Sequence, residues 1–145
     1  MKKMNQEVFE MQKKYFQSGS TRSVEFRAQQ LKTLKRMVKE HEEEIMDAVY
    51  QDFGKAKFEQ YLTEIGLFYD EVNLAVHKLK KWMKPEKQKL PITHVPCKGK
   101  IVQDPYGAVL LISPFNYPFG LIFMPLVGAI AGGNCVMIKP SEYTI

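Results

Sequence analysis

The hydrophobic residues follow a helical spacing in the first part of the chain and form continuous runs in the last part. Apolar side chains three and four residues apart indicate amphipathic helices. Three are predicted: residues 4–17, 22–51 and 57–83. Ser20 or Thr21 is the expected N-terminal cap of the second helix, and Gly54 is expected to close it in the left-handed conformation. Pro85 ends the third helix.

Prolines and short β-like pieces replace the helical pattern in residues 86–104. Residues 92–95 and 100–103 are expected to be extended, with Gly99 between them. This arrangement predicts a hairpin or an excursion away from the main body.

A long uncharged stretch follows, because no charged side chain occurs between Asp104 and Lys139. Residues 108–112 form an apolar run of strand length, which suits a strand covered on both faces. Pro118 is placed for the first position of a helix over residues 119–131, and a second strand covers 135–138. The stretch therefore predicts a βαβ unit.

The same stretch is long enough to span a membrane as a helix. Three prolines, a Gly-Gly pair and two asparagines interrupt it, and such residues are poor in a lone membrane helix. A buried strand–helix–strand accounts for them better, and no membrane association is expected of this segment.

A polar cluster, residues 113–118, lies where the first predicted strand ends. Ligands of open α/β sheets bind at the carboxyl ends of strands. Asn116 has two interpretations: its side chain caps the following helix, or its NH₂ group donates to a developing oxyanion. The glycine fingerprint of dinucleotide sites is absent, because Gly128, Gly132 and Gly133 come at the end of the helix rather than at its start.

Lys139 and Glu142 follow the second strand, three residues apart. A cationic donor and a carboxylate acceptor at this place could together grip vicinal hydroxyls. The alternative is an ordinary surface ion pair after a strand.

Composition narrows the class of protein. The 145 residues suffice for one domain with a core, and 45% hydrophobic with 26% charged residues indicates a globular chain. The net charge of +5 is explained by solvated helix faces, so no nucleic-acid partner is expected. Cys97 and Cys135 have neither disulfide-framework nor metal-ligand spacing, which fits a reducing, cytoplasmic compartment; the N-terminus lacks the apolar core of a secretory signal.

One βαβ unit gives only two parallel strands, whereas parallel sheets need more strands and helices on both faces. We therefore expect the chain to be the N-terminal part of a larger protein, or a fragment that must pair.

Four further motifs are PYG at 105–107, ISPFNYP at 112–118, GAIAGGN at 128–134 and KPSE at 139–142. In this order and spacing they resemble the N-terminal part of an aldehyde dehydrogenase. The upstream motifs DFGK at 52–55 and YLTEI at 61–65 resemble the class 3 branch, which includes fatty and aromatic aldehyde dehydrogenases. The resemblance covers essentially the whole chain.

The resemblance implies an α/β fold, with N-terminal helices and the first βαβ unit of a Rossmann-like cofactor-binding domain that is incomplete here. Residues 1–85 would form its helical part, 86–104 a β-ribbon of the oligomerisation region, and 105–145 the start of the NAD-binding sheet. Class 3 members are typically homodimers.

The family reaction oxidises an aldehyde to a carboxylic acid with NAD(P)⁺. A cysteine thiolate forms a thiohemiacetal, hydride passes to the nicotinamide, and a glutamate-activated water hydrolyses the thioester. By resemblance Asn116 is the catalytic donor to the oxyanion. The cofactor-binding positions are Ser113, Pro114, Phe115, Lys139, Ser141 and Glu142.

The resemblance implies that Lys139 and Glu142 hold the hydroxyls of the adenosine ribose. Because a glutamate repels the 2′-phosphate of NADP, NAD is the favoured cofactor, with NADP possible. Phe115 stands where the family usually has tryptophan, so an aromatic wall is kept. Neither cysteine matches the nucleophile, so the chain alone is expected to be inactive. Two other hypotheses stay open: a non-catalytic pairing module derived from such an enzyme, and a basic membrane-associated protein.

Overall fold

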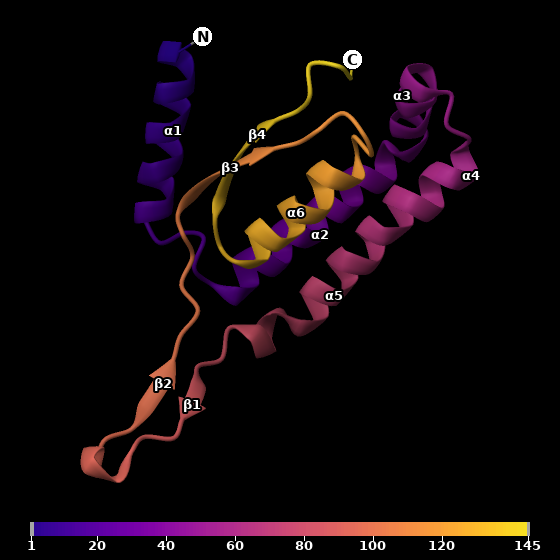
Figure 1. Ribbon diagram of the computed structural model, residues 1–145. Coiled ribbons are helices and arrows are strands. Elements are labelled where there is room, and N and C mark those ends of the chain that lie inside the picture. The colour runs from indigo at the N-terminus through magenta and orange to yellow at the C-terminus, as the bar shows by residue number, and fades with distance from the viewer. Residues whose placement is uncertain (1, 145) are drawn as a thin grey trace.

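A computed structural model describes residues 2–144, with side chains from residue 6 onward (Figure 1). The chain contains a π-helical turn at Tyr61–Ile65 and a 3₁₀ turn at Ile92–His94 in addition to regular helices and strands. The helices and strands are α1 (Lys2–Gln17), α2 (Val24–Glu40), α3 (Glu42–Phe53), α4 (Lys57–Gln60), α5 (Gly66–Trp82), β1 (Glu86–Gln88), β2 (Gly99–Ile101), β3 (Ala108–Ile112), α6 (Gly120–Ala131) and β4 (Cys135–Lys139).

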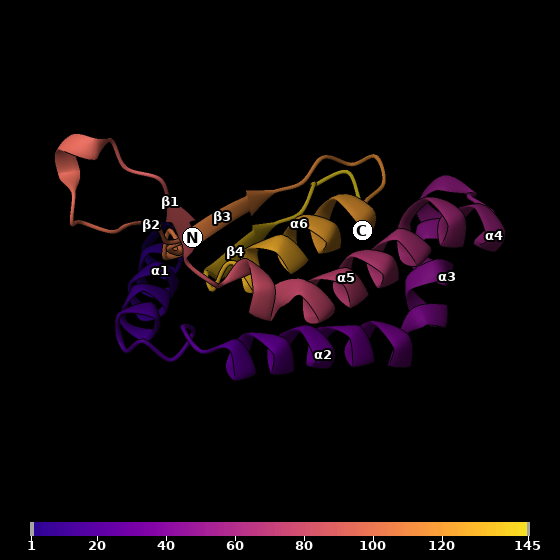
Figure 2. The same cartoon turned by 90° about the horizontal axis from the view of Figure 1, so that it is seen from below.

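The elements form a sheet layer and a helical layer on either side of α6. Strands β3 and β4 pair in parallel, in register from Ala108 opposite Cys135 to Ile112 opposite Lys139. Helix α6 packs on these strands, and α2 and α5 contact α6 and each other (Figure 2). Helix α1 packs on β3 and β4, and the ribbon of β1 and β2 projects from the body (Figure 1). The predicted βαβ unit is confirmed.

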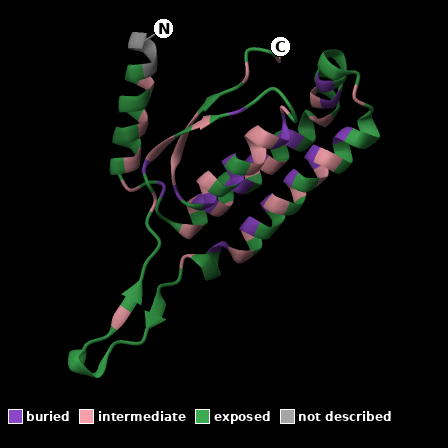
Figure 3. Ribbon diagram, in the orientation of Figure 1, coloured by how far each residue is buried: buried purple, intermediate pink, exposed green. Residues whose placement is uncertain are grey.

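The core lies where α2, α5 and α6 meet, as the buried residues in Figure 3 show. Phe68 on α5 is fully buried, and its ring meets the ring of Phe119 edge to face at a centroid distance of 5.5 Å. Such contacts tie the start of α6 to α5 by apolar burial, the dominant favourable contribution to folding.

The second predicted helix is wrong as a single element, because the chain breaks at His41. This residue ends α2 and begins α3 with φ −111° and ψ 16°, and its ring nitrogen lies 2.9 Å from a Glu44 carboxylate oxygen. Three consecutive glutamates in the first turn of α3 suit a helix N-terminus, where the backbone dipole favours negative charge. A new helix therefore begins where the sequence pattern alone continued the old one.

The predicted cap of α2 is also wrong. Ser23, rather than Ser20 or Thr21, accepts a hydrogen bond from the Phe26 N–H at 3.1 Å. Ser20 instead bonds the Ser18 hydroxyl at 2.7 Å. The C-terminal cap prediction is confirmed, because Gly54 has φ 63° and its N–H bonds the Tyr50 carbonyl.

The third predicted helix is present, but a π-helical turn interrupts it at Tyr61–Ile65. Gly66 lies close under this turn, since a Cβ there would be 2.9 Å from the Tyr61 carbonyl oxygen. π-Helical turns rotate the residues that follow relative to those before, and they are frequent at functional sites. Here the turn carries Glu64.

The ribbon differs from its predicted strands. β1 begins at Glu86 and pairs antiparallel with β2, whereas residues 92–94, expected to be extended, form the 3₁₀ turn between them. The His94 N–H bonds the Pro91 carbonyl at 2.9 Å, which closes this turn. The general expectation of an excursion from the main body is confirmed.

Strand β3 is not covered on both faces by the residues described. Leu110 and Ile112 are 60% and 68% exposed, whereas their neighbours Val109 and Leu111 are partly buried. The side chains of a strand alternate between faces, so the sheet face that carries Leu110 and Ile112 is open at these two residues. Among residues 2–144, no helix has both the length and the hydropathy needed to cross a membrane.

Candidate functional site

The candidate site is the loop between β3 and α6 together with the segment after β4. Ser113 is buried, and its N–H donates to the Lys139 carbonyl at 3.1 Å, which continues the pairing of the two strands. The ring of Phe115 meets the ring of Tyr143 edge to face at 6.3 Å. The structure thus brings together the two clusters that the sequence placed 20 or more residues apart.

Asn116 is exposed and lines a cavity of about 400 Å³ at the start of α6. Phe115, Tyr117 and Pro118 line the same cavity from the loop, and Lys55 lines it from the segment before α4. Tyr117, the next residue, has φ 49°. This is the left-handed region, which a non-glycine residue occupies only when its surroundings hold it there.

The interpretation of Asn116 as the helix cap is wrong. The first free N–H groups of α6, those of Phe119 and Gly120, donate instead to Glu64 Oε2 at 3.1 and 2.9 Å. Helix N-termini leave such donors without partners in the helix, and a carboxylate suits them. The Asn116 side chain makes no hydrogen bond to any residue between 2 and 144, so its amide stays available at the cavity.

Glu64 is also ion-paired. Its Oε1 lies 2.7 Å from Lys55 Nζ, and the exposed fractions of the two side chains are 1% and 13%. Lys55 Nζ also donates to Thr63 Oγ1 at 2.8 Å and lies 4.4 Å from the centroid of the Tyr117 ring. Sequence reasoning assigned no role to Lys55 or Glu64. The available signal was the position of Glu64 on the core-facing stripe, four residues before Phe68.

Lys139 and Glu142 form an ion pair with each other at the surface after β4. The hydrogen bond with Lys139 lowers the pKa of the exposed Glu142 carboxyl group. Ser141 accepts a hydrogen bond from the Tyr143 N–H at 3.1 Å and so shapes the turn that carries Glu142. Pro114 is exposed in the loop, beside Phe115.

The glycine-rich motif at 128–134 is a structural junction. Asn134 accepts from the Gly107 N–H at 3.0 Å and donates to the Ala129 carbonyl at 3.1 Å, so it ties β3 to the end of α6. Arg27, 6% exposed, donates to the carbonyls of Thr21 and Ala131 at 2.8 and 3.1 Å. The pKa of Arg27 is lowered by burial and by nearby Arg22.

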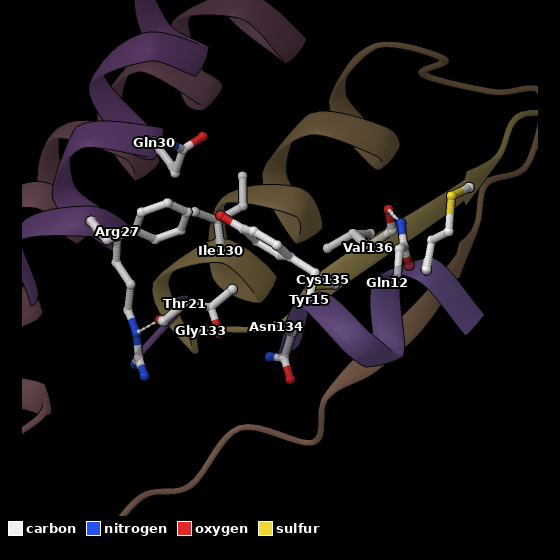
Figure 4. Close-up of a pocket in the computed structure, with 12 residues that line it drawn as sticks. Gln12, Tyr15, Thr21, Arg27, Gln30, Ile130, Gly133, Asn134, Cys135 and Val136 are labelled. Atoms are coloured by element: carbon white, nitrogen blue, oxygen red, sulfur yellow. Dashed lines mark hydrogen bonds between the residues drawn. The ribbon is translucent and has the colours of Figure 1, made fainter. Parts of the chain in front are cut away.

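A second cavity, of about 390 Å³, lies beside this junction between α1, α2 and β4 (Figure 4). Tyr15 and Ile130 contribute apolar side chains to its lining, and Thr21 and Arg27 contribute polar ones. Cys135 lines it and has a pKa raised by burial, so its thiol is not activated.

Neither cysteine belongs to the cavity of Asn116, since Cys97 is exposed in the loop between β1 and β2 and Cys135 begins β4. Within residues 2–144, no group of three or more histidine, cysteine or acidic side chains is placed to hold a metal ion.

The loop of Asn116 follows β3 and the Lys139–Glu142 pair follows β4, so both lie at the carboxyl ends of the parallel strands of an α/β unit. The chain belongs to the aldehyde dehydrogenase family, whose sequence profile it matches over residues 2–145.

The relatives of this chain include members of class 3 of that family. It is 46% identical over 132 residues to the 4,4'-diaponeurosporen-aldehyde dehydrogenase of Staphylococcus aureus, covering 91% of this chain and 29% of that one. It is 46% identical over 127 residues to aldehyde dehydrogenase family 3 member B2 of Mus musculus, covering 88% and 26%. The match lies in the N-terminal part of these enzymes, so the chain spans under a third of their length.

Solved structures agree on the fold. The substrate-bound state of Staphylococcus aureus AldH superposes with a TM-score of 0.92 at 44% identity, over 94% of this chain and 30% of the other. A succinic semialdehyde dehydrogenase of Streptococcus pyogenes, solved with NADP⁺ as the cofactor, has a TM-score of 0.82 at 16% identity over 95% and 30%, a likeness that shows the fold alone. The predicted fold class is confirmed, and only its N-terminal portion is present.

Proposed function

We propose that this chain supplies the oxyanion donor and part of the cofactor site of an NAD(P)-dependent enzyme that oxidises an aldehyde to a carboxylic acid. The observation that carries the proposal is that Glu64, and not Asn116, bonds the backbone amides at the start of α6. Glu64 satisfies the helix amides, which leaves the Asn116 carboxamide free at a cavity. A free NH₂ donor beside a helix N-terminus suits an oxygen that gains negative charge during acyl chemistry.

Preorganisation is the physical advantage of such a donor. The loop is fixed at its start by the Ser113 N–H bond to β4 and at its end by the Tyr117 carbonyl, which accepts the Leu121 N–H at 3.0 Å. A donor already held in place stabilises the oxyanion without reorganising at the moment of reaction. The thiolate that attacks the aldehyde and the carboxylate that activates water are contributed by other parts of the enzyme, because neither Cys97 nor Cys135 lies at this cavity.

The residues present fit a dinucleotide. Lys139 is a donor and Glu142, kept ionised by its lowered pKa, is an acceptor, which together suit the vicinal hydroxyls of a ribose. Ser113, Pro114 and Phe115 would form the wall beside the cofactor, and Ser141 would shape the ribose turn. When bound, the nicotinamide supplies hydride acceptance. The Glu142 carboxylate repels a 2′-phosphate, so NAD is favoured over NADP.

The ribbon of β1 and β2 would serve oligomerisation, as residues 86–104 of the proposed domain division, between a helical part at 1–85 and the cofactor sheet from 105 onward. Its apolar side chains Ile92 and Val95 are 86% and 71% exposed, and a partner strand or subunit would remove such apolar surface from water. A homodimer in the cytoplasm is the proposed assembly of the active enzyme.

The cofactor assignment is tested by kinetics of the active enzyme that carries this segment. Lys139→Met or Glu142→Gln should raise KM for NAD by about tenfold, the equivalent of one lost charge-assisted hydrogen bond, with kcat little changed. Product analysis should give equal amounts of NADH and carboxylic acid. An unchanged KM for NAD in both variants would remove these residues from the ribose site.

A non-catalytic pairing module is the second candidate, favoured by the open sheet face at Leu110 and Ile112. Light scattering on the purified 145-residue chain separates the two. A monodisperse, soluble species supports a module, whereas aggregation supports a segment whose open face is covered by the rest of an enzyme. We also expect the chain alone to form no NADH from NAD and an aldehyde.

A further inference from the structure

A buried ion pair outside the expected set of site residues holds the loop that carries Asn116. Both oxygens of the Glu64 carboxylate are engaged: Oε2 accepts the N–H groups of Phe119 and Gly120, and Oε1 contacts Lys55 Nζ at 2.7 Å. Glu64 comes from the π-helical turn before α5, so the contact joins two elements more than 50 residues apart in sequence.

Lys55 completes the arrangement from a third segment. Its ammonium group lies over the Tyr117 ring at 4.4 Å, and cations are attracted to the face of an aromatic ring. Its own backbone is anchored as well, since the Lys55 carbonyl accepts a hydrogen bond from Gln60 Nε2 at 2.6 Å. Gln60 is 1% exposed, so this hydrogen bond is shielded from water.

The shape of the chain allows this close approach. A Cβ at Gly120 would lie 3.3 Å from Glu64 Cγ and 3.2 Å from Met124 Cε, so only glycine lets the carboxylate reach the helix amides without displacing a neighbour. Tyr117 is held at φ 49° between the bonded amides and the Lys55 ammonium. A residue in this region needs such support, because the conformation is unfavourable by itself.

We infer that Lys55 and Glu64 are positioning residues that act through Tyr117 and the first amides of α6 to fix the place of the Asn116 side chain. The inference rests on the proposed role of Asn116. Only Tyr117 and Pro118 separate Asn116 from the clamped amide of Phe119. Displacing a reacting group by about 1 Å can lower a rate by roughly 10²-fold, so a clamp this near the donor affects kcat.

Lys55 and Glu64 depend on each other because they form a buried ion pair. Removing one partner of a buried ion pair leaves the other charge uncompensated, which is more harmful than removing both. In Glu64→Gln the new NH₂ group would face the Lys55 ammonium, donor against donor, while the remaining oxygen can still accept from the helix. Adding Lys55→Met relieves that conflict, so the double variant should recover part of the loss.

Hydrogen exchange on the active enzyme that carries this segment, read by mass spectrometry with residue-level fragmentation, tests the clamp independently of any activity. In Glu64→Ala the amides of Phe119 and Gly120 should exchange at least about tenfold faster, as expected for loss of a hydrogen bond to a charged group. The Gly132 N–H, which bonds the Gly128 carbonyl at the other end of α6, is the internal control and should be unchanged. If Glu64→Ala unfolds the helix, Glu64→Gln is measured in its place, with the smaller acceleration expected of a neutral acceptor.

Wild-type exchange at Phe119 and Gly120 in a folded Glu64 variant would overturn the clamp. Its link to catalysis is tested in the active enzyme by combining Lys55→Met with Asn116→Ala. Lys55→Met alone should lower kcat about tenfold with KM for NAD unchanged, and should have no further effect once Asn116 is alanine. Lys57→Met is the matched control, because Lys57 is a half-exposed lysine paired with Glu43 and Asp47, and its kcat should equal that of the wild type.

Equal effects of Lys55→Met with and without Asn116 would show that Lys55 does not act through the asparagine, and would overturn the inference. Failure of the proposed function has a different signature. There Asn116→Ala alone leaves kcat unchanged while the exchange of the Phe119 and Gly120 amides still responds to Glu64.

Discussion

Gly133→Ala should be among the most damaging single-methyl changes in this chain. Gly133 has φ 85°, and an added Cβ would lie 2.4 Å from Cζ and Nη2 of Arg27 and 2.6 Å from its Nε. Because real Cβ atoms do not approach other atoms so closely, either the backbone or the guanidinium must move. Gly133 and Arg27 both line the cavity between α1, α2 and β4 (Figure 4).

Two contributions set the size of the effect. The left-handed backbone costs an alanine about 1 to 2 kcal/mol relative to glycine. A displaced Arg27 would lose its bonds to the Thr21 and Ala131 carbonyls, each worth about 1.5 to 3 kcal/mol for a charged donor. The expected loss is therefore at least about 4 kcal/mol, a large share of the roughly 5 to 15 kcal/mol typical of a domain.

Gly54→Ala is the matched control, because Gly54 has φ 63° and no atom lies within 4 Å of its ideal Cβ. It should lose only the backbone contribution. Urea unfolding of the active enzyme that carries this segment, followed by far-ultraviolet circular dichroism, gives both values. In an Arg27→Ala background Gly133→Ala should fall to the value of the control. Equal losses for Gly133→Ala and Gly54→Ala in the wild-type background, within about 0.5 kcal/mol, would refute the Arg27 contact.

Three further predictions concern single groups. Iodoacetamide at neutral pH should label exposed Cys97 before Cys135, whose pKa is raised by burial; peptide mass spectrometry reads the order, and faster labelling of Cys135 would contradict its placement. Asn134→Ala should destabilise the chain by about 2 kcal/mol through two lost hydrogen bonds, measured by urea unfolding, and a loss under about 0.5 kcal/mol would show that this tie is dispensable. Because Lys139 lowers the pKa of Glu142, the carboxylate is ionised at and above its ordinary pKa and becomes protonated only as pH falls through the lowered value. KM for NAD should therefore rise only in acid. A rise in KM near neutral pH would contradict this role of Glu142.

Much of the architecture could be predicted because apolar spacing records which face of an element is buried. The helix stripes, the β3 run and the Gly54 cap all followed from local rules. The break at His41 did not, since the residues on both sides of it keep a good helical pattern. The open face at Leu110 could not be foreseen either, because a continuous apolar run says that something covers a strand without saying which segment does.

The candidate site divides in the same way. The loop at Asn116 and the pair Lys139 and Glu142 stood out by their place after predicted strands, and the structure joins them through the Ser113 bond to β4. The partner of the α6 amides could not be predicted, because a cap from a residue 55 positions earlier leaves no local signature. The nearest polar side chain in the sequence is Asn116, so the local pattern alone assigns the cap of α6 to the wrong residue.

The most direct test of the account is the turnover of Asn116→Ala in the active enzyme. If the free carboxamide donates to the oxyanion, kcat for aldehyde oxidation should fall by about 10² to 10³, the range for one lost oxyanion donor, while KM for NAD stays near the wild-type value. A folded Asn116→Ala enzyme with near-normal kcat would contradict the assignment of this loop.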